Sequence, residues 1–192
     1  KIDINYKDKL GNNCLFYASC SNDINTIKYL QRKYKFDINM ENYSKKNCLM
    51  FACTFINDIH LIEKLVESID SFDENIPRHP DKNYLNNLDI IKYLIEDWKI
   101  NINHVDEKSR TCLEYACLFN SNINLIKYLI EDCKIKIDDK NENKCLLLAC
   151  YNNPNIDIIK YLIEDRKMNI NFIDNYGNNC LLLACYNNRN IN

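Results

Sequence analysis

The nonapeptide CLLLACYNN occurs twice in this chain, at residues 145–153 and, letter for letter, at 180–188. Its shorter frame, Cys-Leu-x-x-Ala, begins at Cys14, Cys48, Cys112, Cys145 and Cys180. A second motif, Ile-Lys-Tyr-Leu, begins at Ile27, Ile91, Ile126 and Ile159, and the variant IEKL begins at Ile62. Successive copies of the second motif therefore lie 35, 29, 35 and 33 residues apart. A period of this length indicates stacked copies of one supersecondary unit.

Each copy has the pattern of a short helix, a break, a second helix and an extended connection. A residue that favours the helix N-cap stands directly before the first-motif cysteine in four copies, at Asn13, Asn47, Thr111 and Asn179. Thr111 and Glu114 have the spacing of a capping box. Apolar residues recur at helical spacing through the second motif, as in NIDIIKYLIED at 155–165. We therefore predict pairs of short helices joined by extended segments such as Asn101-Ile102-Asn103.

These units resemble ankyrin repeats over nearly the whole chain. The family pattern D-x-x-G-x-T-P-L-H-x-A is similar to DNYGNNCLLLA at 174–184 and to DKLGNNCLFYA at 8–18. The family pattern N-x-x-I-V-x-x-L-L is similar to NIDIIKYLI at 155–163. The resemblance implies an all-α ankyrin-repeat solenoid of helix-turn-helix units joined by short β-hairpin loops. The Cys-, Asn- and Ile-rich composition further resembles that of ankyrin repeat proteins from amoeba-infecting giant viruses.

The chain departs from the family pattern at two turns. The glycine that follows the second helix in the family is absent, and Trp98-Lys99, Cys133-Lys134 and Arg166-Lys167 stand near its place. We therefore predict a different turn geometry there. From the extended segment to the cysteine is 9 residues in most copies, as from 103 to 112, but 7 residues in the fifth copy, from 138 to 145. This shortening predicts a blunter hairpin tip in the fifth copy.

The predicted organisation is a single ankyrin-repeat domain spanning 1–192, which is expected to be part of a longer chain. Its units, about six, are predicted at 1–34, 35–68, 69–98, 99–132, 133–166 and 167–192, the last one being incomplete. The unit at 69–98 is degenerate, because 69–88 lacks Cys-Leu-x-x-Ala and its prolines, Pro77 and Pro80, disfavour an ordinary helix. Either this segment has drifted, or it provides an irregular surface for a partner or a bend in the solenoid.

Ten of the eleven cysteines fall at two fixed places in the repeat, and only Cys133 lies outside this pattern. Cysteines five residues apart on a helix point about 140° apart. Equivalent cysteines on neighbouring helices are separated by roughly 8–10 Å, whereas a disulfide needs Cα atoms within about 7 Å and zinc needs four ligands. We therefore predict that the thiols fill space as small apolar groups and bind no cofactor.

In the CLLLACYNN helices, the residues predicted to be buried are Leu146, Ala149, Leu181 and Ala184, with Cys150 and Cys185 behind them. A metal- or redox-dependent cysteine protein is the less favoured alternative.

Other classes of function have little support in the sequence. Phosphate-binding glycine motifs and the zinc motif H-E-x-x-H are absent, so we predict no enzyme and no small-molecule substrate. A formal net charge of −2 without a long basic run gives no reason to expect nucleic-acid binding. Apolar runs near the roughly 20 residues of a membrane span are also absent, so no membrane insertion is expected. The expected location is intracellular and cytoplasmic, which for a viral protein means the host cytoplasm or the virion.

The resemblance implies a non-catalytic protein–protein interaction scaffold of unknown partner, which binds through its hairpin tips and the concave face of its first helices. An alternative is a structural component of a virion or another large assembly. Carried over position by position, the family's contact places give these partner-binding candidates: Lys9, Leu10, Asn12, Tyr43, Ser44, Lys46, Thr54, Phe55, Glu107, Lys108, Arg110, Leu118, Phe119, Tyr151, Asn152, Asn175, Tyr176, Asn178, Tyr186 and Asn187. The second-motif tyrosines are predicted to pack between units instead: Tyr29, Tyr93, Tyr128 and Tyr161. The carboxylate pairs Glu96-Asp97, Glu131-Asp132 and Glu164-Asp165 are predicted to lie on a solvated outer face.

Overall fold

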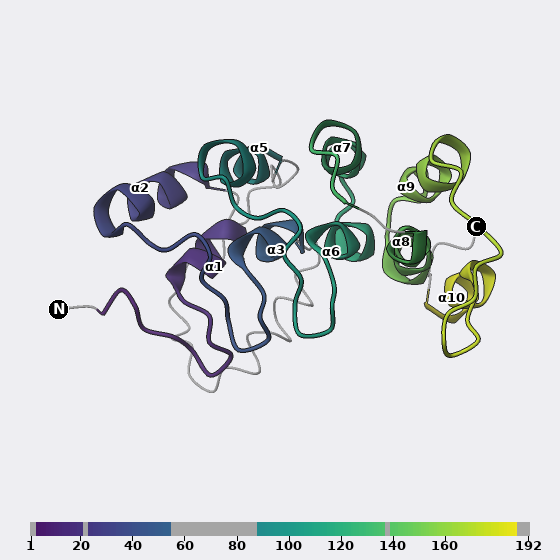
Figure 1. Ribbon diagram of the computed structural model, residues 1–192, viewed down its shortest axis with the longest axis horizontal. Helices are drawn as coiled ribbons and strands as arrows, with labels where there is room; N and C mark the ends of the chain where they lie inside the picture. Colours follow the sequence, from purple (N-terminus) through teal and green to yellow (C-terminus); the bar gives the residue numbers. More distant parts are fainter. Residues whose placement is uncertain (1–2, 21–22, 55–87, 137–138, 188–192) are drawn as a thin grey trace.

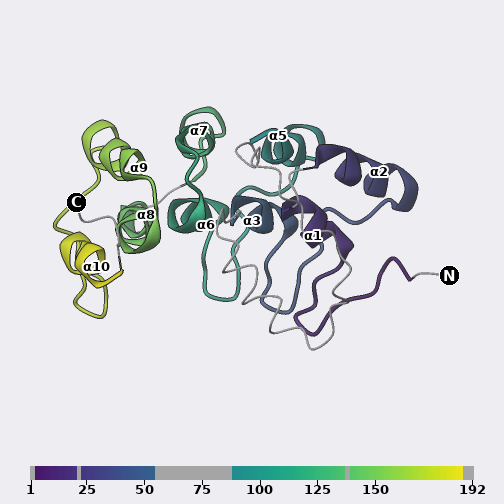
Figure 2. The same ribbon diagram turned by 180° about the vertical axis from the view of Figure 1, so that it is seen from behind.

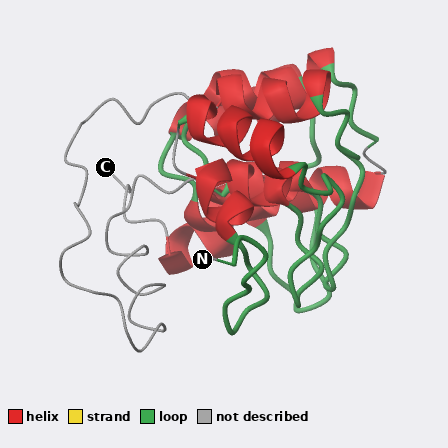
Figure 3. Cartoon of the chain, turned by 90° about the vertical axis from the view of Figure 1, so that its left-hand side faces the viewer, coloured by secondary structure: helices red, strands yellow, loops and turns green. Residues whose placement is uncertain are grey.

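The computed structural model describes residues 3–20, 23–54, 88–136 and 139–187, and their helices form two parallel rows. The first-helix row contains α1 (Cys14–Cys20), α3 (Cys48–Cys53), α6 (Cys112–Phe119), α8 (Asp139–Asn152) and α10 (Cys180–Asn187). The second-helix row contains α2 (Ile24–Tyr34), α5 (Leu88–Lys92), α7 (Ile123–Lys127) and α9 (Ile156–Lys160). Figures 1 and 2 show the two rows from opposite sides, and Figure 3 shows the loops that project from the first-helix row. Because these ranges contain helices and no strand, the predicted all-α solenoid is confirmed, with loops in place of regular β-hairpins.

The inner first helices α3, α6 and α8 each lie between two other first helices. Helix α3 contacts α1 and α6, and α8 contacts α6 and α10. The Leu and Ala of Cys-Leu-x-x-Ala are buried in these positions, as in Leu113 and Ala116. The prediction fails at α10, where Leu181 is 71% exposed and Cys185 is exposed. Helix α10 packs on α8 through one side only, so its remaining face has no neighbouring first helix among the described residues.

The first-helix row passes directly from α3 to α6. These helices are in contact, and their hairpins also meet, since the Glu107 N–H donates to the Ser44 carbonyl oxygen at 3.1 Å. In the second row, α5 lies next to α2. The contact is seen at Tyr93, directly after α5, whose hydroxyl donates to Gln31 Oε1 of α2 at 3.4 Å. These contacts favour α3 and α5 as the two helices of one unit. The predicted division into 35–68 and 69–98, including the degenerate segment 69–88, lies largely outside the described residues and stays a prediction.

The second helices end in a turn that no family glycine provides. Helices α5, α7 and α9 each continue into a π-helical turn of sequence YLIED, namely η1 (Tyr93–Asp97), η2 (Tyr128–Asp132) and η3 (Tyr161–Asp165). The wider turn is closed by a bond over five residues, as from the Trp98 N–H to the Tyr93 carbonyl oxygen at 3.1 Å. A lysine with left-handed backbone follows one residue later, with φ of 57° at Lys99 and 49° at Lys134. The predicted departure in turn geometry is confirmed.

Two further local predictions also hold. Thr111 and Glu114 form the capping box at the start of α6, with the Thr111 N–H donating to Glu114 Oε2 at 2.6 Å. Helix α8 begins at Asp139, well ahead of Cys145. The additional helical turns occupy the chain that forms hairpin tips before α3 and α6, so the connection is blunt as predicted.

Tyrosines of the second helices connect consecutive units. The Tyr128 hydroxyl donates to Glu96 Oε1, and the Tyr161 hydroxyl donates to Glu131 Oε1, both at 2.7 Å. The Lys127 ammonium lies 5.1 Å from the centre of the Tyr161 ring, and Lys92 relates to Tyr128 in the same way. The predicted packing between units is confirmed for these tyrosines and for Tyr93, which contacts Gln31 of α2.

One prediction about this surface needs correction. Tyr29 lies on the first unit and is exposed, and its hydroxyl accepts a hydrogen bond from Lys33 of its own helix at 2.7 Å. The carboxylate pairs are exposed as predicted, and Glu96 and Glu131 in addition accept the tyrosine hydrogen bonds of the next unit. The glutamate of YLIED therefore helps to hold neighbouring units in register.

All eleven cysteines are free thiols, and seven of them are buried. Thiols from the two fixed places meet across three unit boundaries, where Cys53 lies against Cys112, Cys117 against Cys145 and Cys150 against Cys180. Spacing between equivalent cysteines does not predict these contacts, because the partners occupy different places in their units. Burial raises the pKa of Cys20 and of Cys48 to about 12. Such thiols are poor nucleophiles at neutral pH.

Thiol labelling of the folded chain should therefore be dominated by one residue. With a chromogenic disulfide reagent at pH about 8, we expect one fast-reacting thiol, Cys185, because it is the exposed cysteine. Cys185→Ser should remove the fast phase and leave the slow one unchanged. Fast labelling of several thiols in the folded Cys185→Ser variant would show that the cysteines do not serve as core residues.

The left-handed lysines offer a direct test of the turn. A side chain costs about 1 kcal/mol or more in this region of backbone space, and glycine does not carry that cost. We expect Lys134→Gly to raise the free energy of unfolding by about 0.5–1 kcal/mol in urea denaturation. Lys136→Gly, two residues on and without a positive φ, is the matched control and should lower it by a similar amount. Equal effects of the two changes would contradict the turn geometry.

Candidate functional site

Four described hairpins share one closing device. In each, an N–H donates to the carbonyl oxygen four residues later, at 2.9 Å from Asp8 to Asn12 and at 3.0 Å from Asp106 to Arg110. The side chain of the first residue accepts as well: Asp8 Oδ1 binds the backbone N–H groups of Leu10 and Asn12, both at 2.8 Å. The hairpins at 42–46 and 174–178 repeat this arrangement. An aspartate or asparagine is needed at that place because it satisfies two backbone donors of a tight loop.

Three of these hairpins lie side by side and are joined through their backbones. The Tyr43 N–H donates to the Leu10 carbonyl oxygen at 3.0 Å, and Glu107 bonds Ser44 in the next step along the row. The side chains of the same residues remain free to face solvent, since Leu10 is 50% and Tyr43 69% exposed. A rigid edge that exposes apolar and charged side chains is therefore built into the first-helix side of the solenoid.

The predicted partner-binding residues are distributed unevenly over this surface. Those exposed are Lys9, Leu10, Tyr43, Glu107, Lys108, Asn175, Tyr176 and Tyr186. Those half-buried are Ser44, Lys46, Thr54, Arg110, Phe119, Tyr151, Asn152 and Asn178. Phe55 and the side chain of Asn187 lie outside the described residues.

Two of the predicted contact residues are buried and need correction. Asn12 is 3% exposed, because its side chain donates to Asp8 Oδ2 and accepts from Asn42 Nδ2 of the next hairpin. Leu118 is 8% exposed, at the end of a helix that α8 covers. Both positions therefore support the scaffold and do not present side chains to a partner.

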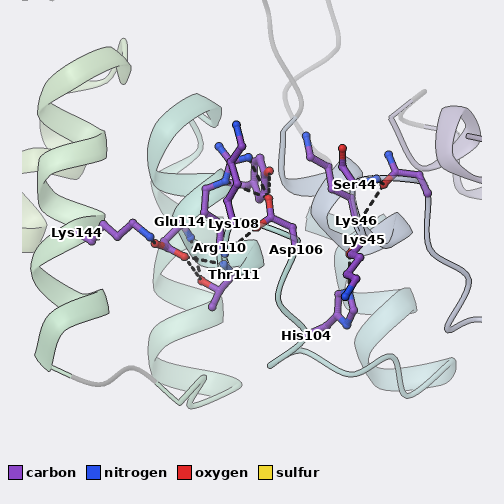
Figure 4. A network of polar contacts seen from close by, with 12 residues as sticks. Ser44, Lys45, Lys46, His104, Asp106, Lys108, Arg110, Thr111, Glu114 and Lys144 are labelled. Carbon is purple, nitrogen blue, oxygen red and sulfur yellow. Dashed lines mark hydrogen bonds and ion pairs between the residues drawn. The ribbon is translucent and has the colours of Figure 1, made fainter. Parts of the chain in front are cut away.

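A buried polar network lies behind the tip of the hairpin at 106–110 (Figure 4). The side chain of Asp106 is fully buried, where it accepts from Arg110 Nε at 3.0 Å and from the Tyr115 hydroxyl at 2.6 Å. Burial opposes its charge, but the hydrogen bonds of Tyr115 and of the Arg110 N–H lower the pKa of Asp106 below its ordinary value. The carboxylate therefore stays charged at neutral pH and holds Arg110 in place.

A second buried carboxylate joins two units. Glu114 is fully buried in α6, and its Oε1 lies 2.6 Å from the ammonium of Lys144 in α8. Sequence reasoning identified Glu114 as a helix cap but missed Lys144 and Tyr115. Lys144 could not be found from spacing, because its contact depends on how α8 lies against α6. Tyr115 had a signal in the repeat, since the Tyr17 hydroxyl donates to Asp8 Oδ2 at the same spacing in the first copy.

The described residues contain neither a candidate metal site nor a candidate membrane-spanning helix. Within these ranges, no group of three or more His, Cys, Asp or Glu side chains is placed to hold a metal ion. None of the described helices combines the length and the apolar character that crossing a bilayer requires.

The hairpin tips can be tested through their two glycines. Gly11 and Gly177 have φ of 81° and 82°, which L side chains rarely adopt. A Cβ on Gly11 would also lie 2.7 Å from the Tyr43 backbone nitrogen, whereas Gly177 has open space. We expect Gly11→Ala to lower the free energy of unfolding by at least about 2 kcal/mol and Gly177→Ala by about 1 kcal/mol. Equal losses in chemical denaturation would show that the first two tips do not touch.

Comparison with known proteins agrees with this geometry. Two family models match, one described as ankyrin repeats in three copies over residues 115–192 and one as ankyrin repeats in many copies over residues 84–130. Together they cover more than half of the chain. No curated protein matches the sequence.

Similarity to solved structures concerns the fold alone. One similar chain comes from the complex of the Bd0816 predatory endopeptidase from Bdellovibrio bacteriovorus with the immunity protein Bd3460, with a TM-score of 0.56 and 20% sequence identity. The alignment covers 92% of this chain and 73% of that chain. The family matches and the stacked two-helix units lead to one conclusion: the chain belongs to the ankyrin repeat family.

Proposed function

We propose that this chain is a non-catalytic scaffold that binds a protein partner through its hairpin tips. Ankyrin repeats generally mediate protein–protein interaction, and an extended solenoid offers a long continuous surface for it. The surface proposed here, called the tip surface, consists of Lys9, Leu10, Tyr43, Ser44, Glu107 and Lys108. The observation that carries the proposal is the exposure of Leu10 and Tyr43 on hairpins whose backbones are already joined.

Rigid presentation favours binding at this surface. A loop that is already ordered loses little conformational entropy when a partner binds. Tyrosine contributes a large contact area with few rotatable bonds and is enriched among residues that dominate binding energy. The backbone bonds between tips fix Tyr43 beside Leu10, so the pair forms one apolar patch flanked by charged residues. This is the usual arrangement of an apolar centre with a polar rim.

We expect the concave face of the first helices, with Phe119, Tyr151 and Tyr186, to contribute less to partner binding than the tip surface. Phe119 packs partly against the hydrophobic core, so its loss would also affect stability. Tyr151 stacks on Tyr186, with ring centres 6.5 Å apart and an angle of 15° between the planes. Rings that already pack against each other add less to binding than the exposed ring of Tyr43 in the tip surface.

Alanine substitution of the tip pair tests the proposal. The immobilised chain is used to capture proteins from an extract of its source cells, and a captured protein is purified for calorimetric titration. We expect the double variant Leu10→Ala/Tyr43→Ala to weaken its binding by about tenfold or more, because central aromatic contacts dominate affinity. Circular dichroism should show unchanged helix content.

A matched control separates the tip surface from general exposure of apolar groups. Ile156 is 56% exposed and lies in α9, in the second-helix row. Ile156→Ala should leave the affinity unchanged. A partner that binds the tip variant normally, or that is lost with Ile156→Ala instead, would place the interface elsewhere.

A further inference from the structure

One hairpin differs from the other three in its charges. In three hairpins the first residue is an aspartate, whose Oδ2 binds the side chain four residues later: Asp8 with Asn12 at 3.0 Å, Asp106 with Arg110 at 3.0 Å, and Asp174 with Asn178 at 3.1 Å. In the hairpin at 42–46 the first residue is the neutral Asn42, and the residue four later is Lys46. The position therefore carries a cation without the carboxylate that its equivalents have.

The amide of Asn42 does not replace the missing charge. Its Nδ2 donates to Asn12 Oδ1 at 2.9 Å, and its Oδ1 accepts from the backbone N–H groups of Ser44 and Lys46. The side chain of Lys46 is left to reach across the unit boundary, where its ammonium lies 4.8 Å from the centre of the Tyr115 ring. No carboxylate of the described residues lies within ion-pair distance of it.

A second cation shares the same ring. The Arg110 guanidinium lies 4.9 Å from the Tyr115 ring centre, so one ring carries two positive groups. Asp106 Oδ2 already accepts from Arg110 Nε and Nη2 and from the Tyr115 hydroxyl. The charges that act on Lys46 are the cations Arg110 and Lys108 and the carboxylates Asp106 and Glu107, so the cluster with Lys46 carries three positive charges and two negative ones. Burial and the charge of Arg110 both lower the pKa of Lys46 below its ordinary value. A half-buried ammonium beside another cation is a place where an added negative charge would be favourable.

We propose that Lys46 and Arg110, over the Tyr115 ring, bind the carboxylate of an aspartate or glutamate side chain on the protein partner. This inference rests on the proposed scaffold function and deepens it, because the site adjoins the tip surface through Tyr43 and Ser44. One uncompensated charge matches a carboxylate, whereas a phosphate dianion would bring a second negative charge toward Asp106. The exposed Leu10 and Tyr43 next to the site select a partner segment that carries an apolar residue near its acidic one.

The carboxylate site can be tested without knowing the partner. The isotope-labelled full chain is titrated by NMR with acetyl-Glu-amide, a blocked amino acid with one free carboxylate, and with neutral acetyl-Gln-amide. We expect saturable shifts at Lys46, Arg110 and Tyr115 with the first compound and none with the second. Inorganic phosphate is titrated in parallel and should bind more weakly.

Substitutions identify the group responsible. Lys46→Gln should abolish the shifts, Lys46→Arg should retain them, and Lys45→Gln, which removes the same charge from the neighbouring exposed lysine, should leave them unchanged. The carboxylate assignment is overturned if acetyl-Glu-amide causes no saturable shift, if Lys46→Gln still shows it, or if phosphate binds at least as tightly. A captured partner that still depends on Leu10 and Tyr43 would then leave the scaffold function intact and remove only the carboxylate site.

Discussion

Stacking of first helices is the constraint on which the rest of this structure depends. Helices α1, α3 and α6 have 7, 6 and 8 residues, lengths at which an isolated helix is not stable in water. Each must therefore be stabilised by packing against neighbouring helices. Alanine and cysteine make this possible, because small side chains such as Ala116 and Cys117 allow two helix backbones to approach closely. At α10, which has no following first helix among the described residues, the leucine of the same motif is exposed, whereas Leu15 of α1, which α3 follows, is buried.

Polar side chains between units then set the register of the stack. Asn153 is buried in the turn after α8, and its Nδ2 donates to the Cys117 carbonyl oxygen at 2.7 Å and to that of Asn120 at 3.0 Å. Asn155 binds the Ser121 carbonyl oxygen at 2.8 Å in the same way. Buried carbonyl groups at a helix end need such partners. The many asparagines of the turns therefore have a structural function at these positions, in addition to any bias in composition.

The sequence was informative wherever structure follows from the period or from near neighbours. The two-helix unit, the Thr111 cap and the tyrosines that join units all follow from spacing within one copy or from repetition between copies. Contacts that depend on the offset between units were not predictable. The contact of Cys117 with Cys145 and the burial of Asn12 by Asn42 both join positions about 30 residues apart that are not equivalent in the repeat.

The stacking of α3 on α6 illustrates the same limit. Their cysteines, Cys48 and Cys112, are separated by nearly two periods, and regular counting places another first helix between them. Contact between the two helices shows that sequence distance is not a measure of position in the stack. The hydrogen bond from Tyr93 to Gln31 places α5 in the second row accordingly.

In each hairpin, different atoms stabilise the stack and face a partner. This separation explains how such a scaffold can acquire a specific partner. The bonds that join neighbouring tips, as from Tyr43 to Leu10, are made by backbone atoms and are indifferent to the side chains at those positions. The side chains that hold the loop are Asp8, Asn42 and Asp106, which point back toward their own backbone. Substitution of the exposed tip residues can therefore change what the surface recognises at little cost to the stack. Gly11 is the exception, since the backbone of Tyr43 occupies the space that any side chain there would need.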